Sequence, residues 1–286
     1  MKAFSETNAA KILYSRNRTL VMGVINVTPD SFSDGGKHLE PEVAVASGLR
    51  MIEQGADIVD VGGESTRPGS APIGLQEELR RVLPVIEGIC SARSDAVVSI
   101  DTRRSKVASA ALEIGASIVN DVAGFRDDPR SLDVAQEAGA AVVVMHMLGQ
   151  PNTMQQEIQY HSFPDDIYAF FRERIEFAEN KGIPPENIVI DPGIGFGKTF
   201  DQNLVLINRM DFFKSLGKPI LSGPSRKSFL GKILDQPSPH LRDIGTLGAV
   251  AASIMRGASI VRVHDVVQTV DVCRVVDAIV RERAEL

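Results

Sequence analysis

The chain has 286 residues, of which 43% are hydrophobic and 24% charged, and its formal net charge is −6. This composition is ordinary for a globular protein with a full apolar core. The chain has a net negative charge and lacks the excess positive charge typical of nucleic-acid-binding proteins, so the composition argues against that class. The chain has neither an apolar signal region at its N-terminus nor an apolar run long enough to span a membrane. Its two cysteines, Cys90 and Cys273, are too few for a disulfide framework or a metal site. We therefore expect a cytoplasmic protein with neither a nucleic-acid nor a membrane partner.

Short apolar runs alternate with amphipathic segments along the whole chain. The candidate strands are Thr19–Ile25, Asp57–Val61, Ala96–Ile100, Ser117–Val119, Ala140–Met145, Asn187–Ile190, Pro219–Leu221 and Ser259–Val263. Helical patterns fill the intervals, at residues 41–54, 76–92, 104–114, 130–138, 164–181, 201–215, 226–234 with 243–256, and 266–284.

This alternation predicts parallel strands joined by right-handed crossovers. Eight strand–helix units fit an α/β protein with a single (β/α)8 TIM barrel domain, which usually needs about 250 residues. A doubly wound open sheet is the alternative, but it normally uses fewer strands. We place the barrel at residues 19–284, after an N-terminal extension over residues 1–18.

Polar residues follow the apolar runs where each predicted strand ends. In a TIM barrel these ends meet at one mouth, where catalytic sites form. For a single position, the simple return of polarity after a strand is an equally good explanation. The convergence of so many acids, amides and bases on one mouth predicts a site. The residues are Asn26, Asp60, Asp101, Asn120, His146, Asp191, Ser222, Arg262 and His264.

The stretch Asp191–Lys198 follows the sixth candidate strand and contains three glycines. Glycine-rich loops before helices often bind phosphate through backbone N–H groups. However, a P-loop requires Gly-x4-Gly-Lys-[Ser/Thr], and a dinucleotide fingerprint requires Gly-x-Gly-x-x-Gly. The spacing Gly193-x-Gly195-x-Gly197-Lys198 matches neither pattern, so the phosphate hypothesis is weak here.

The strand ends and their loops together resemble dihydropteroate synthases, a family of pterin-binding barrels. Two departures from the family pattern are Leu148, where a polar residue is expected, and Pro239–Thr246, which lacks an expected Glu-Arg pair. The matching stretches are Gly23–Gly36, Asp60–Gly69, Ser99–Thr102, Asn120–Asp121, Met145–Met147, Asp191–Lys198, Ser225–Ser228 and Arg262–Val266.

The resemblance implies condensation of (7,8-dihydropterin-6-yl)methyl diphosphate with 4-aminobenzoate, giving 7,8-dihydropteroate and diphosphate in folate biosynthesis. It also implies Mg2+ as cofactor, sulfonamides as competitive ligands and a homodimer. Two other functions stay open: a methyltetrahydrofolate-dependent corrinoid methyltransferase, and a non-catalytic pterin-binding paralogue. The methyltransferase needs neither a diphosphate nor an aminobenzoate site, so the matches at residues 66–68 and 225–228 count against it.

The resemblance implies that the pterin is held by Asp101, Asn120, Asp191, Lys227 and Arg262. Carboxylates suit this ligand because they accept paired N–H groups from the amino-pyrimidinone edge of the ring. Arg262 could also stack on the ring. Asp101 has an alternative explanation, since Asp-Thr before a helix is good N-cap chemistry.

The diphosphate is expected to meet Asn26, Thr66, Arg67, Arg262 and His264, with Asn26 also the Mg2+ ligand. Arg262 and His264 are two residues apart in a strand, so their side chains face one side. A histidine that is simply hydrogen-bonded at a strand end is the alternative for His264. Two long polar loops, at residues 28–36 and 65–73, are expected either to cover the site or to be ordinary solvent loops.

By the same resemblance, the 4-aminobenzoate contacts are Thr66, Pro68, Phe196, Lys227 and Ser228. Its carboxylate is expected at the N-terminus of a helix beginning near residue 225, where free N–H groups favour an anion. The expected mechanism is SN1-like: diphosphate leaves first, the pterin ring delocalises the cation, and the arylamine attacks. The implied catalytic residues are Asp101, Asp191, Lys227, Arg262 and His264.

Overall fold

The computed structural model describes residue 13 and residues 18–28, 40–65 and 69–282. Eight parallel strands form one sheet in the order β6-β5-β4-β3-β2-β1-β8-β7. A parallel bridge from Ile190 to Ile220 brings β6 to the residue before β7 and nearly closes the ring. The predicted (β/α)8 barrel is confirmed. The strands are β1 (Leu20–Asn26), β2 (Ile58–Gly62), β3 (Val98–Asp101), β4 (Ile118–Asp121), β5 (Ala141–Met145), β6 (Ile188–Asp191), β7 (Leu221–Ser222) and β8 (Ile260–Val263).

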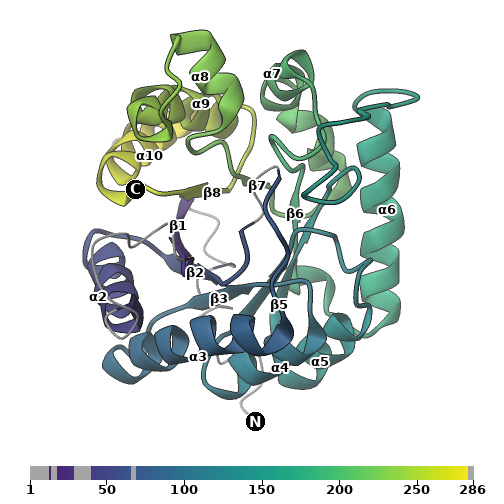
Figure 1. The fold of residues 1–286 in the computed structure, drawn as a ribbon. Coiled ribbons are helices and arrows are strands. Elements are labelled where there is room, and N and C mark those ends of the chain that lie inside the picture. The colour runs from purple at the N-terminus through teal and green to yellow at the C-terminus, as the bar shows by residue number, and fades with distance from the viewer. Residues whose placement is uncertain (1–12, 14–17, 29–39, 66–68, 283–286) are drawn as a thin grey trace.

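The helices surround the strands and follow them in chain order (Figure 1). The crossover after β7 carries two α-helices, as the sequence patterns predict. The α-helices after β1 are α2 (Glu40–Glu53), α3 (Leu75–Ala92), α4 (Ser105–Glu113), α5 (Arg130–Ala138), α6 (Asp165–Asn180), α7 (Phe200–Asn208), α8 (Ser228–Leu234), α9 (Asp243–Met255) and α10 (Val266–Arg281). The 3-10 helices are η3 (Pro185–Asn187), η4 (Met210–Leu216) and η5 (Pro239–Arg242).

Two elements differ from the sequence prediction. The helix expected over residues 201–215 is divided, because α7 ends at Asn208 and η4 continues as a 3-10 helix. The strand expected from Pro219 begins only at Leu221. Proline has no N–H to donate to a strand ladder, although the Pro219 carbonyl accepts a hydrogen bond from Ile190 N at 3.0 Å.

The interior of the barrel is apolar toward the N-terminal ends of the strands and polar toward their C-terminal ends. Side chains two positions apart on a strand face the same side. The apolar layer is therefore followed, two residues later, by Asp60, Asn120, Asp191 and Arg262 at the opposite end. The buried apolar cluster contains Leu13, Leu20, Met22, Ile58, Val97, Ile118, Ala141, Val143, Val189, Leu221 and Ile260.

The residue before β1, Thr19, is hydrogen-bonded to the last helix, α10. Thr19 donates from its backbone N and its Oγ1 to the Asp277 carboxylate of α10, at 2.6 and 2.8 Å. Leu13 packs in the apolar cluster of the barrel interior. The predicted division at residue 18 stays a prediction. Among the described helices, none combines the length and apolarity needed to cross a membrane.

Candidate active site

A cavity lies at the C-terminal ends of the strands, where the sites of this fold form. Its lining includes both carboxylates, the amide and both cations that the sequence assigns to the pterin, together with Phe196. The structure thus brings six predicted residues to one cavity, while their roles stay predictions. The lining residues are Asp101, Asn120, Val122, Met145, Asp191, Ile194, Phe196, Gly223, Lys227 and Arg262.

Arg262 of β8 connects two acidic strand ends across the mouth. Its Nε donates to Asp60 Oδ2 at 2.7 Å, and its Nη2 donates to Asp101 Oδ2 at 2.8 Å. Burial works to lower the pKa of Arg262, but the charges of Asp60 and Asp101 outweigh it and raise the pKa above its usual value. The guanidinium therefore stays charged and fixes the positions of both carboxylates.

Asp60 is a site residue to which the sequence analysis gave no role. It is fully buried, and its Oδ2 accepts both from Arg262 and from Asn120 Nδ2, the latter at 3.1 Å. The signal in the sequence was its inward position, two residues after Ile58 of the apolar layer. Asp60 orients one predicted pterin ligand and one predicted diphosphate ligand.

Asp101 is not an N-cap, contrary to the alternative drawn from sequence. Helix α4 begins at Ser105, and its N-cap residue is Arg104. The Ser105 N–H donates to the carboxylate of Asp128, at 3.0 Å, and not to Asp101. Asp101 instead pairs with Arg262. Burial raises the pKa of Asp101 to about 7, with Arg262 opposing the rise and Asp60 adding to it.

Asp191 stands at the end of β6, where its Oδ1 accepts from Gly193 N at 2.7 Å. Burial raises the pKa of Asp191, against the hydrogen bond from Gly193 and the positive charges of Lys198 and Lys227. Lys227 Nζ also lies 4.0 Å from the centroid of the Phe196 ring, in cation–π geometry. The predicted pterin and aminobenzoate contacts are therefore adjacent.

The three glycines of the loop after β6 all have positive φ, at 68° for Gly193, 85° for Gly195 and 64° for Gly197. A Cβ on Gly193 would lie 2.0 Å from His146 O, and one on Gly197 would lie 2.7 Å from Leu148 O. These glycines therefore let the loop pack against the chain after β5. Leu148, the departure from the family pattern, belongs to this packing.

Lys198 gives no support to the phosphate hypothesis. It is only 2% exposed, and its Nζ donates to His146 O at 2.9 Å. The ammonium thus faces the protein interior behind the loop.

Three further predicted residues, two at strand ends and one at a helix start, lie outside the ten that line the cavity. Asn26 ends β1 beside Gly62 of β2. His264 Nδ1 shares a hydrogen bond with Ser225 Oγ at 2.9 Å, which agrees with the simpler alternative for this histidine. Ser228 is the exposed first residue of α8, so this helix begins three residues later than expected. The predicted ligands Thr66, Arg67 and Pro68 lie outside the described residues.

A family model described as pterin binding enzyme matches residues 22–264. The chain belongs to this pterin-binding enzyme family. It is 46% identical over 264 residues to a dihydropteroate synthase of Synechocystis, covering 92% of this chain and 91% of that one.

Similar solved structures include two dihydropteroate synthases. The Xanthomonas albilineans dihydropteroate synthase with 4-aminobenzoic acid matches with a TM-score of 0.87 and 42% identity, covering 92% of this chain and 94% of that one. The Yersinia pestis dihydropteroate synthase with a sulfonamide drug matches with a TM-score of 0.87 and 40% identity, covering 93% and 95%.

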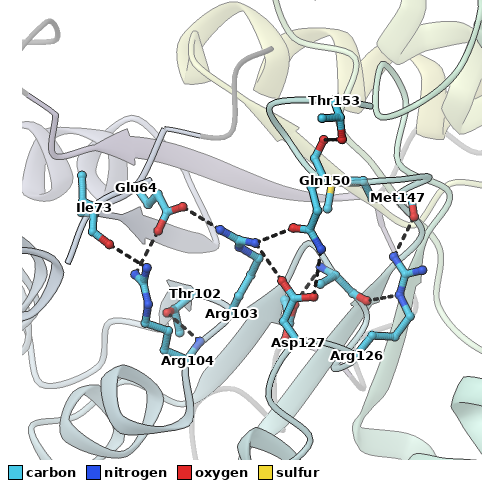
Figure 2. A network of polar contacts seen from close by, with 12 residues as sticks. Glu64, Ile73, Thr102, Arg103, Arg104, Arg126, Asp127, Met147, Gln150 and Thr153 are labelled. Carbon is cyan, nitrogen blue, oxygen red and sulfur yellow. Dashed lines mark hydrogen bonds and ion pairs between the residues drawn. The ribbon is translucent and has the colours of Figure 1, made fainter. Parts of the chain in front are cut away.

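A polar network joins the loops around the mouth of this pterin-binding barrel (Figure 2). Arg103 Nη2 donates to Glu64 Oε1 at 2.6 Å, and its Nη1 donates to Asp127 Oδ2 at 2.7 Å and Gln150 Oε1 at 2.9 Å. Arg104 binds Glu64 Oε2 at 2.9 Å. One arginine pair therefore links the loops after β2, β3, β4 and β5, although nothing in the sequence marked it.

Asp121 is a buried acid at the end of β4 with an incomplete set of hydrogen-bond partners. Its Oδ1 accepts from Ala123 N at 2.7 Å, while its Oδ2 has no hydrogen-bond partner in the described part of the chain. Burial raises the pKa of Asp121 from 3.8 to about 7, partly opposed by the Ala123 N–H. The folded protein thus binds a proton that the unfolded chain releases between these two values, so this group makes stability fall as pH rises from about 4 to 7.

We predict that Asp121→Asn is more stable than the native chain at pH 8, by about 2–4 kcal/mol, and nearly equal to it at pH 4. The amide keeps the acceptor for Ala123 N but is neutral at both pH values. Urea unfolding at the two pH values measures the difference. The exposed Asp211→Asn is the matched control and should change neither value. An equal gain at both pH values, or a loss at pH 8, would contradict this account of Asp121.

Proposed function

We propose that this chain is a dihydropteroate synthase, which condenses (7,8-dihydropterin-6-yl)methyl diphosphate with 4-aminobenzoate to give 7,8-dihydropteroate and diphosphate. The observation that carries the proposal is the cavity, which combines Asp101, Asn120 and Asp191 with Lys227 and Arg262 at the mouth of a pterin-binding barrel. Acceptors for a pterin edge and cations for a diphosphate therefore occur together. The relatives described above carry the same enzyme name.

The pterin is held by its polar edge. Asp101 and Asp191 accept its N–H groups, Asn120 supplies both a donor and an acceptor, and Lys227 donates to the ring carbonyl or a ring nitrogen. Arg262 keeps Asp101 in place through its 2.8 Å hydrogen bond. These four residues and Arg262 line the same cavity, so the ring can be bound along one edge without movement of the strands.

The leaving diphosphate is held by Arg262, His264, Thr66, Arg67 and Asn26. Asn26 offers one hard oxygen at the end of β1, and no cluster of three His, Cys, Asp or Glu side chains that could hold a metal occurs among the described residues. This donor set fits Mg2+, which binds few protein ligands when phosphate oxygens supply the others. When bound, the ion would neutralise negative charge on the diphosphate.

The protein's own groups favour departure of the diphosphate before attack. Arg262 and His264 stabilise the negative charge that grows on the leaving group. Asp101 and Asp191 lie against the pterin, where they stabilise the positive charge that spreads into the ring. The arylamine then attacks the methylene carbon, and no strong general base is required because the amine loses its proton after the bond forms.

The 4-aminobenzoate packs on Phe196, beside Lys227, with Pro68, Thr66 and Ser228 as the further contacts. The Phe196 ring already carries the Lys227 ammonium on its face. An aryl carboxylate placed here meets both an apolar surface and a positive charge. Sulfonamides share this aryl shape, so we expect them to compete for the same place.

We further propose a cytoplasmic homodimer whose interface is the joint face of α9 and α10. These helices pack side by side on the outside of the barrel (Figure 1). Large apolar side chains on them are 47–72% exposed, which is unusual for a helix face left in water. A second copy of the same face would cover them. They are Ile244, Met255, Val267, Val275, Ile279 and Val280.

The test of the proposed activity is turnover by the purified chain with dihydropterin diphosphate, 4-aminobenzoate and Mg2+. We expect release of diphosphate and formation of dihydropteroate, inhibited by a sulfonamide in competition with 4-aminobenzoate. Pterin binding without release of diphosphate would indicate the non-catalytic paralogue instead.

We predict that Asp191→Asn weakens pterin binding by about 10- to 100-fold, because a charge-assisted hydrogen bond contributes about 1.5–3 kcal/mol. The amide keeps the acceptor for Gly193 N, so the fold should persist. Calorimetric titration with the pterin measures the loss, and the exposed Asp211→Asn serves as control. Unchanged affinity would remove Asp191 from the binding site.

We predict that Ile279→Asp, at a position 62% exposed on α10, converts the dimer to a monomer. A charge at the centre of an apolar interface is desolvated without a partner. Sedimentation velocity measures the state. The control is Val43→Asp on α2, 47% exposed, which should leave the dimer intact. A native chain that sediments as a monomer would contradict the interface.

A further inference from the structure

Lys198 is a buried cation at the mouth that the proposed reaction leaves without a role. It ends the glycine loop Asp191–Lys198 and is 2% exposed. Its Nζ donates to His146 O at 2.9 Å and lies 2.9 Å from His146 Nδ1. Burial of an ammonium is costly unless hydrogen bonds and an opposite charge compensate it, so a lysine in this position needs an explanation.

Both ends of the glycine loop bind the same residue, His146. At the near end, His146 N donates to the Asp191 backbone oxygen at 2.9 Å. At the far end, Lys198 donates to the His146 backbone oxygen. Within the loop, Gly193 N binds the Asp191 carboxylate and Phe196 N binds Gly193 O at 3.0 Å. Lys198 thus closes a ring of contacts that places the Asp191 carboxylate and the Phe196 side chain in the cavity.

Lys198 is also one of three cations that act on the Asp191 carboxylate, the others being Lys227 and Arg262. Burial raises the pKa of Asp191, and these charges, with the Gly193 N–H, oppose the rise. In return, burial lowers the pKa of Lys198 well below its usual value, and the Asp191 charge works against that change. The two groups therefore favour each other's charged forms.

His146, which follows β5 and contacts Lys198, is kept neutral by its surroundings. Burial, with the charges of Lys198 and Arg126, lowers the pKa of His146 to about 2. Arg126 is itself fixed by donation to Met147 O at 2.7 Å (Figure 2). A neutral His146 offers Nδ1 as an acceptor for the Lys198 ammonium. Among the charged groups that shift the pKa of Lys198, the Asp191 carboxylate raises it, and the cations Lys227 and Arg126 lower it.

We propose that Lys198 is a positioning residue for pterin binding, which closes the glycine loop on His146 and supplies positive charge that keeps the Asp191 carboxylate ionised. This role rests on the proposed function, because it requires Asp191 to bind the pterin. Lys198 itself touches no substrate: its side-chain hydrogen bonds go to His146, and it is not among the ten residues that line the cavity.

The test is Lys198→Met, which keeps the length and the apolar stem of the side chain but removes the charge and the donor. Binding of 6-hydroxymethyl-7,8-dihydropterin is measured by calorimetry between pH 5.5 and 9. We expect at least about tenfold weaker binding at pH 7, with the acid-side loss of affinity beginning about one pH unit higher than in the native chain. Without the ammonium, Asp191 takes up its proton at a higher pH, and a protonated carboxyl accepts fewer hydrogen bonds.

Lys218→Met is the matched control. Lys218 is also largely buried, with its side chain 8% exposed, and it donates to Glu179 at 2.7 Å and to Pro185 O at 2.8 Å at the opposite end of the barrel. Its removal should leave affinity and pH profile unchanged. If Lys198→Met does not fold, Lys198→Gln retains a donor for His146 O without the charge, and the same displacement along the pH axis is expected.

Equal affinity of the native chain and the Lys198 variant at every pH would overturn the proposal. A loss of the same size at every pH would also overturn it, because the lysine would then act only through packing. Native protein that binds no pterin at any pH would instead refute the proposed function. If the native and Lys218→Met proteins bind the pterin and turn over normally, and the Lys198 variant has the same affinity and pH profile, the role of Lys198 alone is refuted.

Discussion

The ion pairs of Arg262 with Asp60 and Asp101 determine how the mouth of this barrel is built. They join β8 to β2 and β3 across the strand ends, through hydrogen bonds of 2.7 and 2.8 Å. Removing the guanidinium would leave buried acids without compensation, at a cost of about 3–5 kcal/mol. Because Asp60 also accepts a hydrogen bond from Asn120, one arginine fixes the orientation of an amide and a carboxylate that we propose as pterin contacts.

The layered interior of the barrel explains why these charges lie at one end. The apolar layer formed by residues such as Met22, Ile58 and Val189 fills the N-terminal half of the barrel. Alternation along each strand then presents the next inward residue to the mouth. The apolar layer supplies stability, and the polar layer above it is free to carry charge. The Lys198–His146 contact adds a buried charged group in the loop after β6, at the same end of the barrel as the polar layer.

Much of the fold follows from the sequence, because strands and helices alternate with clear apolar patterns. The late start of β7 and the division of α7 from η4 depend on hydrogen bonding that the pattern does not carry. Of the six predicted residues that line the cavity, Asp101, Asn120, Asp191 and Arg262 stand near a strand end, whereas Lys227 and Phe196 came from the family resemblance.

The contacts between distant elements could not be read from the chain. The pairing of Arg262 with Asp60 joins residues 202 positions apart, and the Arg103 network joins four loops through side-chain directions that spacing does not specify. The burial of Lys198 was also not predictable. In the sequence Lys198 follows a glycine, as a phosphate ligand could, but in the structure its Nζ is buried against His146. The sequence places Asp121 only within the matching stretch Asn120–Asp121, and its Oδ2, which has no hydrogen-bond partner among the described residues, is a feature of the fold alone.

In the proposed function, the cavity between Asp101 and Asp191 holds a pterin by its amino-pyrimidinone edge. A crystal structure of the chain with bound 7,8-dihydropteroate tests it most directly. We expect hydrogen bonds of about 3 Å from the pterin edge to both carboxylates and Asn120, with the aryl ring against Phe196. A pterin ring bound elsewhere, or one whose polar edge meets neither carboxylate, would contradict the account.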